Sequence, residues 1–214
     1  MNTPRFFLFA FLTSALAMSA FISTAAEPTD RCCALTPLDA IAPADAAVTT
    51  LPDKSLYLLD SSWKNQHDQT VKLADYSGRP VIILMGYLGC QTACPLLLNK
   101  AETLLAELPE KDRSQVKPIF VSFDPAHDTP TSATAYIAER GLECSGWDIL
   151  MGTPDSVREL AAILGIRYQA QADGNIFHSN IISVLDDSGV IRAQLLNLSD
   201  EPRPVVEALK GLTR

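Results

Sequence analysis

The chain has 214 residues, of which 47% are hydrophobic, and a formal net charge of −8. This length suits one domain with short extensions, and the apolar content is enough for an ordinary core. The acidic balance and the lack of any lysine or arginine cluster argue against a nucleic-acid partner. Five cysteines are too few for a small fold built from disulfides.

Residues 1–26 have the pattern of an export signal. Arg5 precedes the apolar run FFLFAFLTSALAMSAFI, and small residues follow at positions 23–26. The run is close to the length of a membrane span, but Thr13, Ser14 and Ser19 interrupt it. We therefore expect a cleaved signal peptide, with a retained membrane tether as the alternative. Either way the remainder is exported, and it is periplasmic if the source is a Gram-negative bacterium.

Residues 27–52 are rich in alanine, proline, threonine and aspartate and have no helical or strand period, which is typical of a linker or arm. The predicted domain covers residues 53–214. Its first part, LYLLD (56–60) and TVKLADY (70–76), alternates enough for a hairpin around a polar turn at His67. The apolar run PVIILMGY (80–87) predicts a strand buried on both faces.

The leucine spacing in residues 95–108 predicts an amphipathic helix, and residues 116–123 form a second buried strand. Helices follow at 132–140 and 155–164. Strands at 180–185 and 190–195 flank the turn Asp-Asp-Ser-Gly, and a helix at 204–212 closes the chain. This order predicts an α/β domain with a mixed sheet flanked by helices. It is the thioredoxin-like order, with an N-terminal hairpin and a helical insertion between Thr129 and Trp147.

The stretch GYLGCQTACP places Cys90 just past a strand and Cys94 at the start of a helix. A four-residue spacing in a helical turn puts both sulfurs on one side, and helix N-terminal amides favour a thiolate there. Dithiol redox exchange is possible, although the loop is one residue longer than Cys-x-x-Cys. Structural zinc needs a second ligand pair that the sequence lacks. Paired thiolates favour Cu(I).

A third donor would have to be one of three histidines. His67 and His127 lie in polar turns and are interpreted as surface residues. His178, in GNIFHSN, directly precedes the strand at 180–185, and in this topology that loop folds back against the first helix. Its position alone leaves open whether His178 is a ligand or a structural histidine.

The chain resembles the Sco/SenC family of copper-binding, thioredoxin-like proteins over roughly residues 51–211. The resemblance rests on the stretches GYLGCQTACP, FVSFDPAHDTP, GWDILMGTPDSVRELAAILGIRY and FHSNIISVLDDSG. It implies that Cys90, Cys94 and His178 bind copper. It also implies a role in maturing the dinuclear copper centre of cytochrome c oxidase, by delivering copper or by reducing the cysteines that will hold it.

The chain departs from the family pattern near the first cysteine. Gly89 and Gln91 stand where the family commonly has a histidine or polar residue and a proline, Thr92 replaces a frequent acidic residue, and His127 replaces a frequent arginine. Losing a nearby carboxylate is expected to alter the preference between Cu(II) and Cu(I).

Three cysteines lie outside the shared pattern: Cys32, Cys33 and Cys144. We expect a structural disulfide tying the arm to the domain rather than an auxiliary metal site, with a pairing that the sequence does not assign.

These observations predict a metallochaperone rather than an enzyme, in which Cys90, Cys94 and His178 hold Cu(I) and tolerate Cu(II). Its expected partner is the copper-binding subunit of cytochrome c oxidase or another copper chaperone, and it is expected to be a monomer. The alternative is a thiol-disulfide oxidoreductase that uses Cys90 and Cys94 to reduce the cysteines of a copper-receiving partner.

Overall fold

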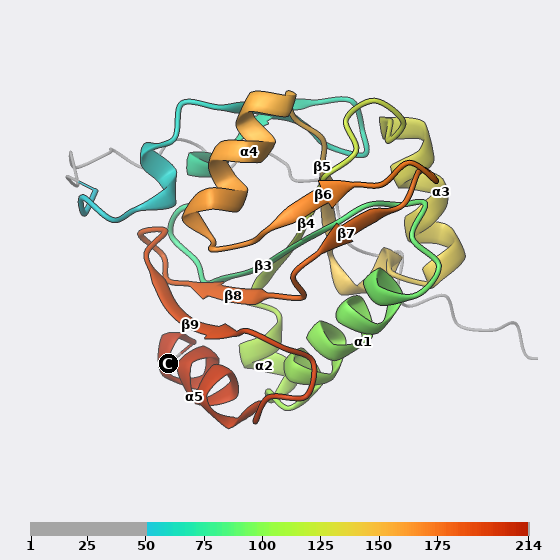
Figure 1. Cartoon of the computed structure of the whole chain (residues 1–214). Helices are drawn as coiled ribbons and strands as arrows, with labels where there is room; N and C mark the ends of the chain where they lie inside the picture. Colours follow the sequence, from blue (N-terminus) through green and yellow to red (C-terminus); the bar gives the residue numbers. More distant parts are fainter. Residues whose placement is uncertain (1–50, 214) are drawn as a thin grey trace, which may run out of the picture. The chain divides into compact units, whose positions relative to one another are not determined.

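The computed structural model describes residues 51–213 and has a five-stranded mixed sheet at its centre (Figure 1). In spatial order the strands are β5 (Asp148–Leu150), β4 (Lys117–Ser122), β3 (Val81–Gly86), β8 (Ile182–Leu185) and β9 (Ile191–Leu195). β3, β4 and β5 run parallel, whereas β8 is antiparallel to both β3 and β9. The predicted α/β class and mixed sheet are confirmed.

Successive residues of β3 point to opposite faces of the sheet, as its pleat requires. Ile82 and Leu84 pack in a core with α1 (Ala93–Ala106), α3 (Pro130–Arg140) and α5 (Arg203–Leu212). Ile83 and its neighbours on the other face pack against α4 (Pro154–Ile163) and the segment that precedes β3. All six residues of β3 are buried, as the continuous apolar run predicts.

The predicted helices are present, with starts that local chemistry explains. α3 and α4 each begin with proline after a threonine whose side chain accepts a backbone N–H, from Ser132 and Ser156 respectively. α1 begins at Ala93, two residues before the proline expected to open it, so Cys94 lies inside its first turn. A short helix, α2 (Glu110–Arg113), follows α1 and was not predicted.

The predicted N-terminal hairpin exists, but its first strand was placed wrongly. Residues 56–60 are not a strand, because Leu56–Leu58 form the 3-10 turn η1, capped by Ser55. Adjacent residues Leu56 and Tyr57 are both buried, which a strand with one buried face does not allow. The hairpin instead pairs β1 (Ser62–Lys64) with β2 (Thr70–Lys72), and η2 (Leu73–Tyr76) follows.

The insertion between residues 129 and 147 is helical, as expected, and contains α3 and the 3-10 turn η3 (Glu143–Ser145). Two features were missed. One is β5, the short parallel strand at the sheet edge. The other is a separate antiparallel hairpin of β6 (Tyr168–Ala170) and β7 (Ile176–His178), which forms a two-stranded sheet of its own.

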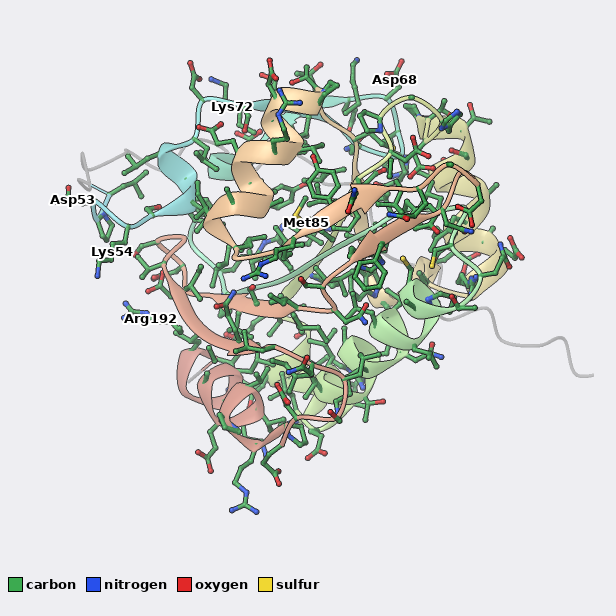
Figure 2. All side chains as sticks on the ribbon, viewed as in Figure 1. Asp53, Lys54, Asp68, Lys72, Met85 and Arg192 are labelled. Carbon is green, nitrogen blue, oxygen red and sulfur yellow. The ribbon has the colours of Figure 1, made fainter. Side chains whose placement is uncertain are left out.

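Charged side chains such as Asp68, Lys72 and Arg192 lie at the surface, whereas Met85 lies in the sheet and is fully buried (Figure 2). Within residues 51–213 no helix is long and apolar enough to cross a membrane. The predicted signal or tether (1–26) and nearly all of the predicted linker (27–52) lie outside the described residues.

Candidate functional site

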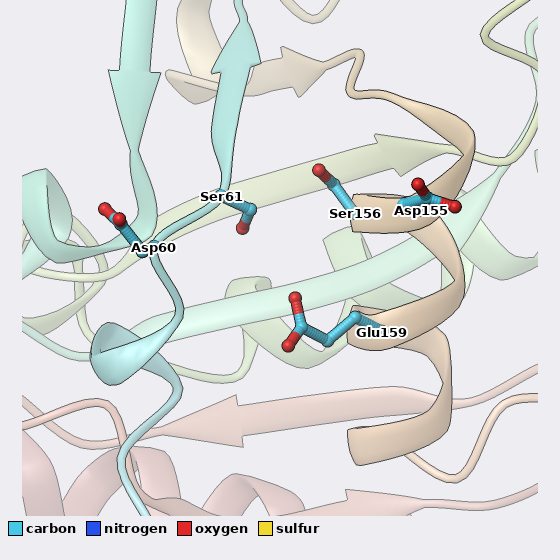
Figure 3. Close-up of a pocket in the computed structure, with 5 residues that line it drawn as sticks. All are labelled: Asp60, Ser61, Asp155, Ser156 and Glu159. Carbon is cyan, nitrogen blue, oxygen red and sulfur yellow. The ribbon is translucent and has the colours of Figure 1, made fainter.

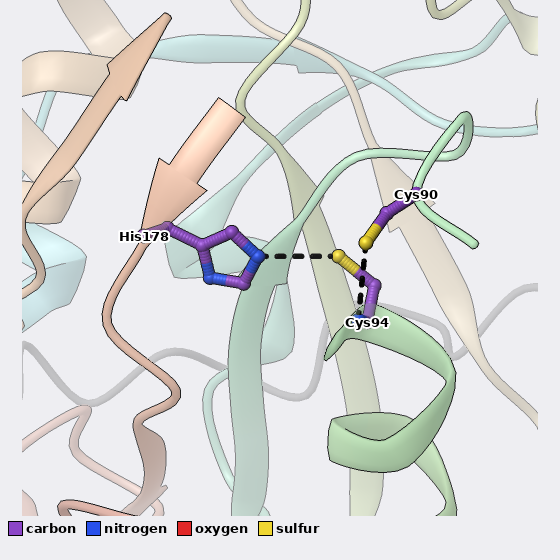
Figure 4. Close-up of side chains that lie close together, drawn as sticks. All are labelled: Cys90, Cys94 and His178. Carbon is purple, nitrogen blue, oxygen red and sulfur yellow. Dashed lines mark hydrogen bonds between the residues drawn. The ribbon is translucent and has the colours of Figure 1, made fainter. Parts of the chain in front are cut away.

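Two sulfurs and one imidazole converge where β3, α1 and the β6–β7 hairpin meet (Figure 4). The candidate ligand atoms of Cys90, Cys94 and His178 all lie within 4.8 Å of one another, and all three residues are buried. Zinc binds cysteine and histidine at about 2.0–2.3 Å, so the donors of a three- or four-coordinate site are roughly 3.3–4 Å apart. The three donors therefore lie nearly at the separation that one metal ion requires.

The two cysteines are placed by the connection from β3 to α1. Cys90 follows β3 in a tight turn, in which its N–H donates to the Tyr87 carbonyl at 3.2 Å. The Cys94 N–H donates to the Cys90 sulfur at 3.3 Å. Thr92, at the N-cap position of α1, makes no side-chain capping bond, so the Cys90 sulfur serves as a cap instead.

A buried carboxylate fixes the loop that carries Cys90. Asp128 is 8% exposed, and its Oδ2 accepts the Leu88 N–H at 3.1 Å and the Ser122 hydroxyl at 2.5 Å. Leu88 lies two residues before Cys90, and Ser122 ends the neighbouring strand β4. Asp128 therefore ties the cysteine loop to the sheet.

His178 is the last residue of β7 and is oriented by its own backbone surroundings. Its Nδ1 lies 3.1 Å from the Ser179 carbonyl, and its Nε2 lies 3.3 Å from the Cys94 sulfur. A carbonyl only accepts hydrogen bonds, so Nδ1 carries the proton and Nε2 directs its lone pair at the sulfur. Phe123 and Tyr87 flank the ring, with centroid distances of 5.1 Å and 6.4 Å.

The surroundings make the two thiols chemically unequal. Burial opposes ionisation of Cys90, but the backbone N–H groups of Cys94, Thr92 and Ala93 outweigh it and hold the pKa of this thiol below its ordinary value. Burial raises the pKa of Cys94 well above its ordinary value. Burial also lowers the pKa of His178 and keeps the imidazole neutral, the form that binds metals.

The donor set fits a soft metal ion, because thiolates select Cu(I) and imidazole suits copper in either oxidation state. Among the described residues no other group of three cysteine, histidine or carboxylate side chains could hold a metal ion. Cys90 and Cys94 are present as free thiols. The arrangement can therefore bind a metal or exchange disulfides.

The other predicted residues lie elsewhere. His67 and His127 are at the surface, and His127 pairs with Asp124 at 2.8 Å. Cys144 lies in η3, while Cys32 and Cys33 lie outside the described residues, so their pairing stays a prediction. A surface hollow lined by carboxylates and hydroxyls contains none of the three candidate ligands (Figure 3). Its lining residues are Asp60, Ser61, Asp155, Ser156 and Glu159.

Sequence reasoning missed three residues that shape the site: Gly86, Tyr87 and Asp128. A side chain at Gly86 would meet Cys94, Tyr87 packs against both cysteines, and Asp128 anchors the loop. Asp128 belongs to the turn DPAHDTP, whose aspartates were a usable signal, because an acidic side chain in a turn readily accepts backbone N–H groups.

The fold and the site together define a thioredoxin-like protein with a dithiol and an imidazole arranged as a metal centre. The chain belongs to the SCO1/SenC family, whose model matches residues 57–214. One relative, a candidate copper-binding protein of Stutzerimonas stutzeri, is 25% identical over 61% of this chain. The mitochondrial protein SCO2 of Saccharomyces cerevisiae is 26% identical over 55% of it. The matched segments span 65% and 43% of those two relatives.

Solved structures of similar proteins support the fold assignment. Bradyrhizobium japonicum ScoI with copper bound superposes with a TM-score of 0.59 and is 24% identical, covering 71% of this chain and 96% of its own. A SCO1/SenC family lipoprotein of Bacillus anthracis gives a TM-score of 0.65 at 18% identity. It covers 77% of this chain and 99% of its own.

Proposed function

We propose that this chain is an exported copper metallochaperone that holds copper between Cys90, Cys94 and His178. The convergence of the three donors within 4.8 Å carries the proposal. Membership of the SCO1/SenC family and the copper-bound ScoI structure with the same fold support it. The proposed recipient is the copper-binding subunit of cytochrome c oxidase or another copper chaperone.

The site suits transfer as well as binding. A three-donor site leaves a coordination position that an incoming thiol or imidazole can take, so ligands can be replaced one at a time. Two sulfurs match Cu(I), and the neutral His178 nitrogen supplies the harder donor that Cu(II) requires. Oxidation of the two thiols to a disulfide would remove both sulfur ligands and release the metal, which couples copper transfer to thiol chemistry.

The second candidate function is thiol-disulfide exchange with the cysteines of a copper-receiving partner. The unequal thiols favour it specifically, because Cys90 has a lowered pKa and can attack, while Cys94 stays protonated. In such an exchange the Cys90 thiolate attacks the partner's disulfide. Cys94 then gives up its proton and attacks the Cys90 sulfur of the mixed disulfide. The bond between Cys90 and the partner breaks, the departing partner thiolate takes up a proton, and a Cys90–Cys94 disulfide and two reduced partner thiols remain.

Copper titration of the reduced chain and its variants separates the two functions. His178→Ala is expected to weaken Cu(II) binding at least about 100-fold and to change the copper absorption spectrum, because it removes a direct ligand. His127→Ala is the matched control and is expected to bind copper like the unmodified chain, because this side chain is exposed and paired with Asp124. The metallochaperone proposal fails if His178→Ala binds both copper ions normally while Cys90→Ala abolishes disulfide exchange.

A further inference from the structure

The hairpin that carries His178 is attached to the domain at few places. Among the strands of residues 51–213, β6 and β7 pair only with each other and form no hydrogen-bonded ladder with the five-stranded sheet. At the base of the hairpin, Phe123 stacks on Tyr168 at 4.7 Å, while the Ser179 N–H donates to the Arg167 carbonyl at 2.9 Å and so continues the pairing of the two strands. Toward the tip, Ile176 packs against the cluster of Tyr87, Cys90 and Cys94. The position of the imidazole therefore depends on what holds the other end of the hairpin.

Tyr87 reaches the hairpin tip from the cysteine loop. Its hydroxyl donates to the Asn175 side-chain oxygen at 3.3 Å, between residues 88 positions apart. The ring is 6% exposed, packs against Cys90 and Cys94, and lies edge-on to His178 at an interplanar angle of 85°. One side chain thus contacts the three candidate ligands and bonds to the turn that precedes β7.

The turn presents the Asn175 oxygen to Tyr87 in a fixed orientation. The Asn175 Nδ2 donates to Asp173 Oδ2 at 2.8 Å, and the Asn175 backbone N–H donates to Asp173 Oδ1 at 3.0 Å. A carboxylate only accepts, so the amide NH₂ must face Asp173 and the amide oxygen is left for the tyrosine hydroxyl. The Gln171 N–H donates to the Asn175 carbonyl at 2.7 Å and closes the turn.

We propose that Tyr87 and Asn175 form a latch that holds His178 against the two sulfurs. The inference rests on the proposed function, because it assigns the latch to the imidazole ligand of the same copper site. Both are positioning residues and coordinate nothing themselves. Opening the latch frees the end of the hairpin and lowers the fraction of molecules in which the imidazole is placed for binding. Cu(II), which depends on the nitrogen donor, is affected more than Cu(I), which the two sulfurs hold.

Tyr87→Phe tests the latch because it removes only the hydroxyl. The expected result is about a two- to tenfold loss of Cu(II) affinity, the range that one lost hydrogen bond supplies, with a much smaller change for Cu(I). Asn175→Ala should give a similar loss, and the double variant should lose no more than either single variant. Tyr168→Phe is the matched control, because it removes a hydroxyl from the same hairpin and keeps the ring that stacks on Phe123.

Amide hydrogen exchange of the reduced, copper-free chain provides a second readout. Tyr87→Phe should raise exchange in residues 168–178 severalfold and leave β3 and β4 unchanged, because local opening of the hairpin becomes easier. Losses that add in the double variant, or equal losses for Cu(I) and Cu(II), would overturn the latch. His178→Ala is run in parallel. If His178→Ala binds copper as tightly as the unmodified chain, the proposed function fails. If His178→Ala loses copper affinity but Tyr87→Phe does not, only the latch is refuted.

Discussion

Gly86, the last residue of β3, has no side chain and so leaves room for the Cys94 sulfur. A Cβ added at this position would be 2.9 Å from the Cys94 sulfur and 2.7 Å from Cζ of Phe120. Neither neighbour can retreat easily. Cys94 is fully buried in the first turn of α1, and Phe120 is 1% exposed and packs against Tyr136 with a centroid distance of 6.0 Å. Gly86→Ala must therefore displace the sulfur, the ring or the strand.

The loss of stability expected for Gly86→Ala can be estimated from these contacts. Non-bonded carbon atoms prefer separations of about 3.5–4.0 Å, so relief at Phe120 needs a shift of roughly 0.8 Å or more. Overpacking of this kind costs about 1–3 kcal/mol, and the better strand propensity of alanine offsets about 0.5–1 kcal/mol. We expect a net loss of about 1–2 kcal/mol in the free energy of unfolding. Copper affinity should fall at least about tenfold, because ligand placement to within about 0.5 Å matters.

Denaturant unfolding of the reduced, copper-free chain measures the free energy of unfolding, and competitive copper titration measures the copper affinity. Gly152→Ala is the matched control, because its Cβ would lie 2.5 Å from the Trp63 ring, in the core on the other face of the sheet. It should lose stability and keep its copper affinity. Gly211→Ala in α5, with no atom within 4 Å, should lose neither. The reasoning is refuted if Gly86→Ala binds copper as tightly as Gly152→Ala does.

Three further predictions concern ionisable groups. Alkylation of the reduced chain, followed by mass spectrometry across pH, should show Cys90 reacting with a midpoint below that of an ordinary thiol and Cys94 reacting only after unfolding. If Cys90 and Cys94 were alkylated equally in the folded chain, the two thiols would not differ in pKa as we infer. Burial lowers the pKa of His178, so the unfolded chain takes up the proton first. Stability should fall as pH drops below about 6.5, and His178→Gln should flatten that fall in a denaturation series. Lys117→Met leaves the Asp148 carboxylate without the ammonium group 2.8 Å away. It should lower the free energy of unfolding by about 3 kcal/mol and leave copper affinity unchanged. An unchanged free energy of unfolding would show that this ion pair does not stabilise the fold.

The sheet and its helices could be predicted from the sequence because their signals are local. β3 and β4 are continuous apolar runs, and α1 has leucines at helical spacing. The segment at 56–60 failed because a short apolar run does not show which of its residues will be buried. Leu56 and Tyr57 are both buried, which a 3-10 turn allows and a strand with one buried face does not. Each of the strands β5, β6 and β7 is three residues long, and each forms because the fold places a pairing strand beside it. No periodicity can appear in so short a run.

The residues of the candidate site also differ in whether a local sequence pattern reveals them. Cys90 and Cys94 could be found from their spacing beside a strand end. His178 could not be assigned from the residues alone, because its contact with Cys94 joins positions 84 apart and depends on a hairpin that was not predicted. Tyr87 acts through a hydrogen bond to the distant Asn175 and has no local signal. The turn around Asp128 indicates that its carboxylate accepts backbone N–H groups, but not that one of them belongs to Leu88, 40 positions away.

The three candidate ligands differ in how firmly the fold holds them, and this difference bears on the order of copper transfer. Cys94 is fully buried in a helix packed on the sheet, and Cys90 lies in a loop that Asp128 anchors. His178 lies on a hairpin outside the main sheet, held near its tip by the 3.3 Å hydrogen bond from Tyr87 to Asn175 and by the packing of Ile176. If the chain transfers copper by ligand exchange, as proposed, the donor with the least costly displacement leaves first, and the imidazole is expected to depart before either sulfur. A recipient would then meet copper held by two thiolates, the form in which Cu(I) is most stable. Release of His178 is therefore expected to favour Cu(I) over Cu(II) at the site, and the proposed latch at Tyr87 would set how readily that release begins.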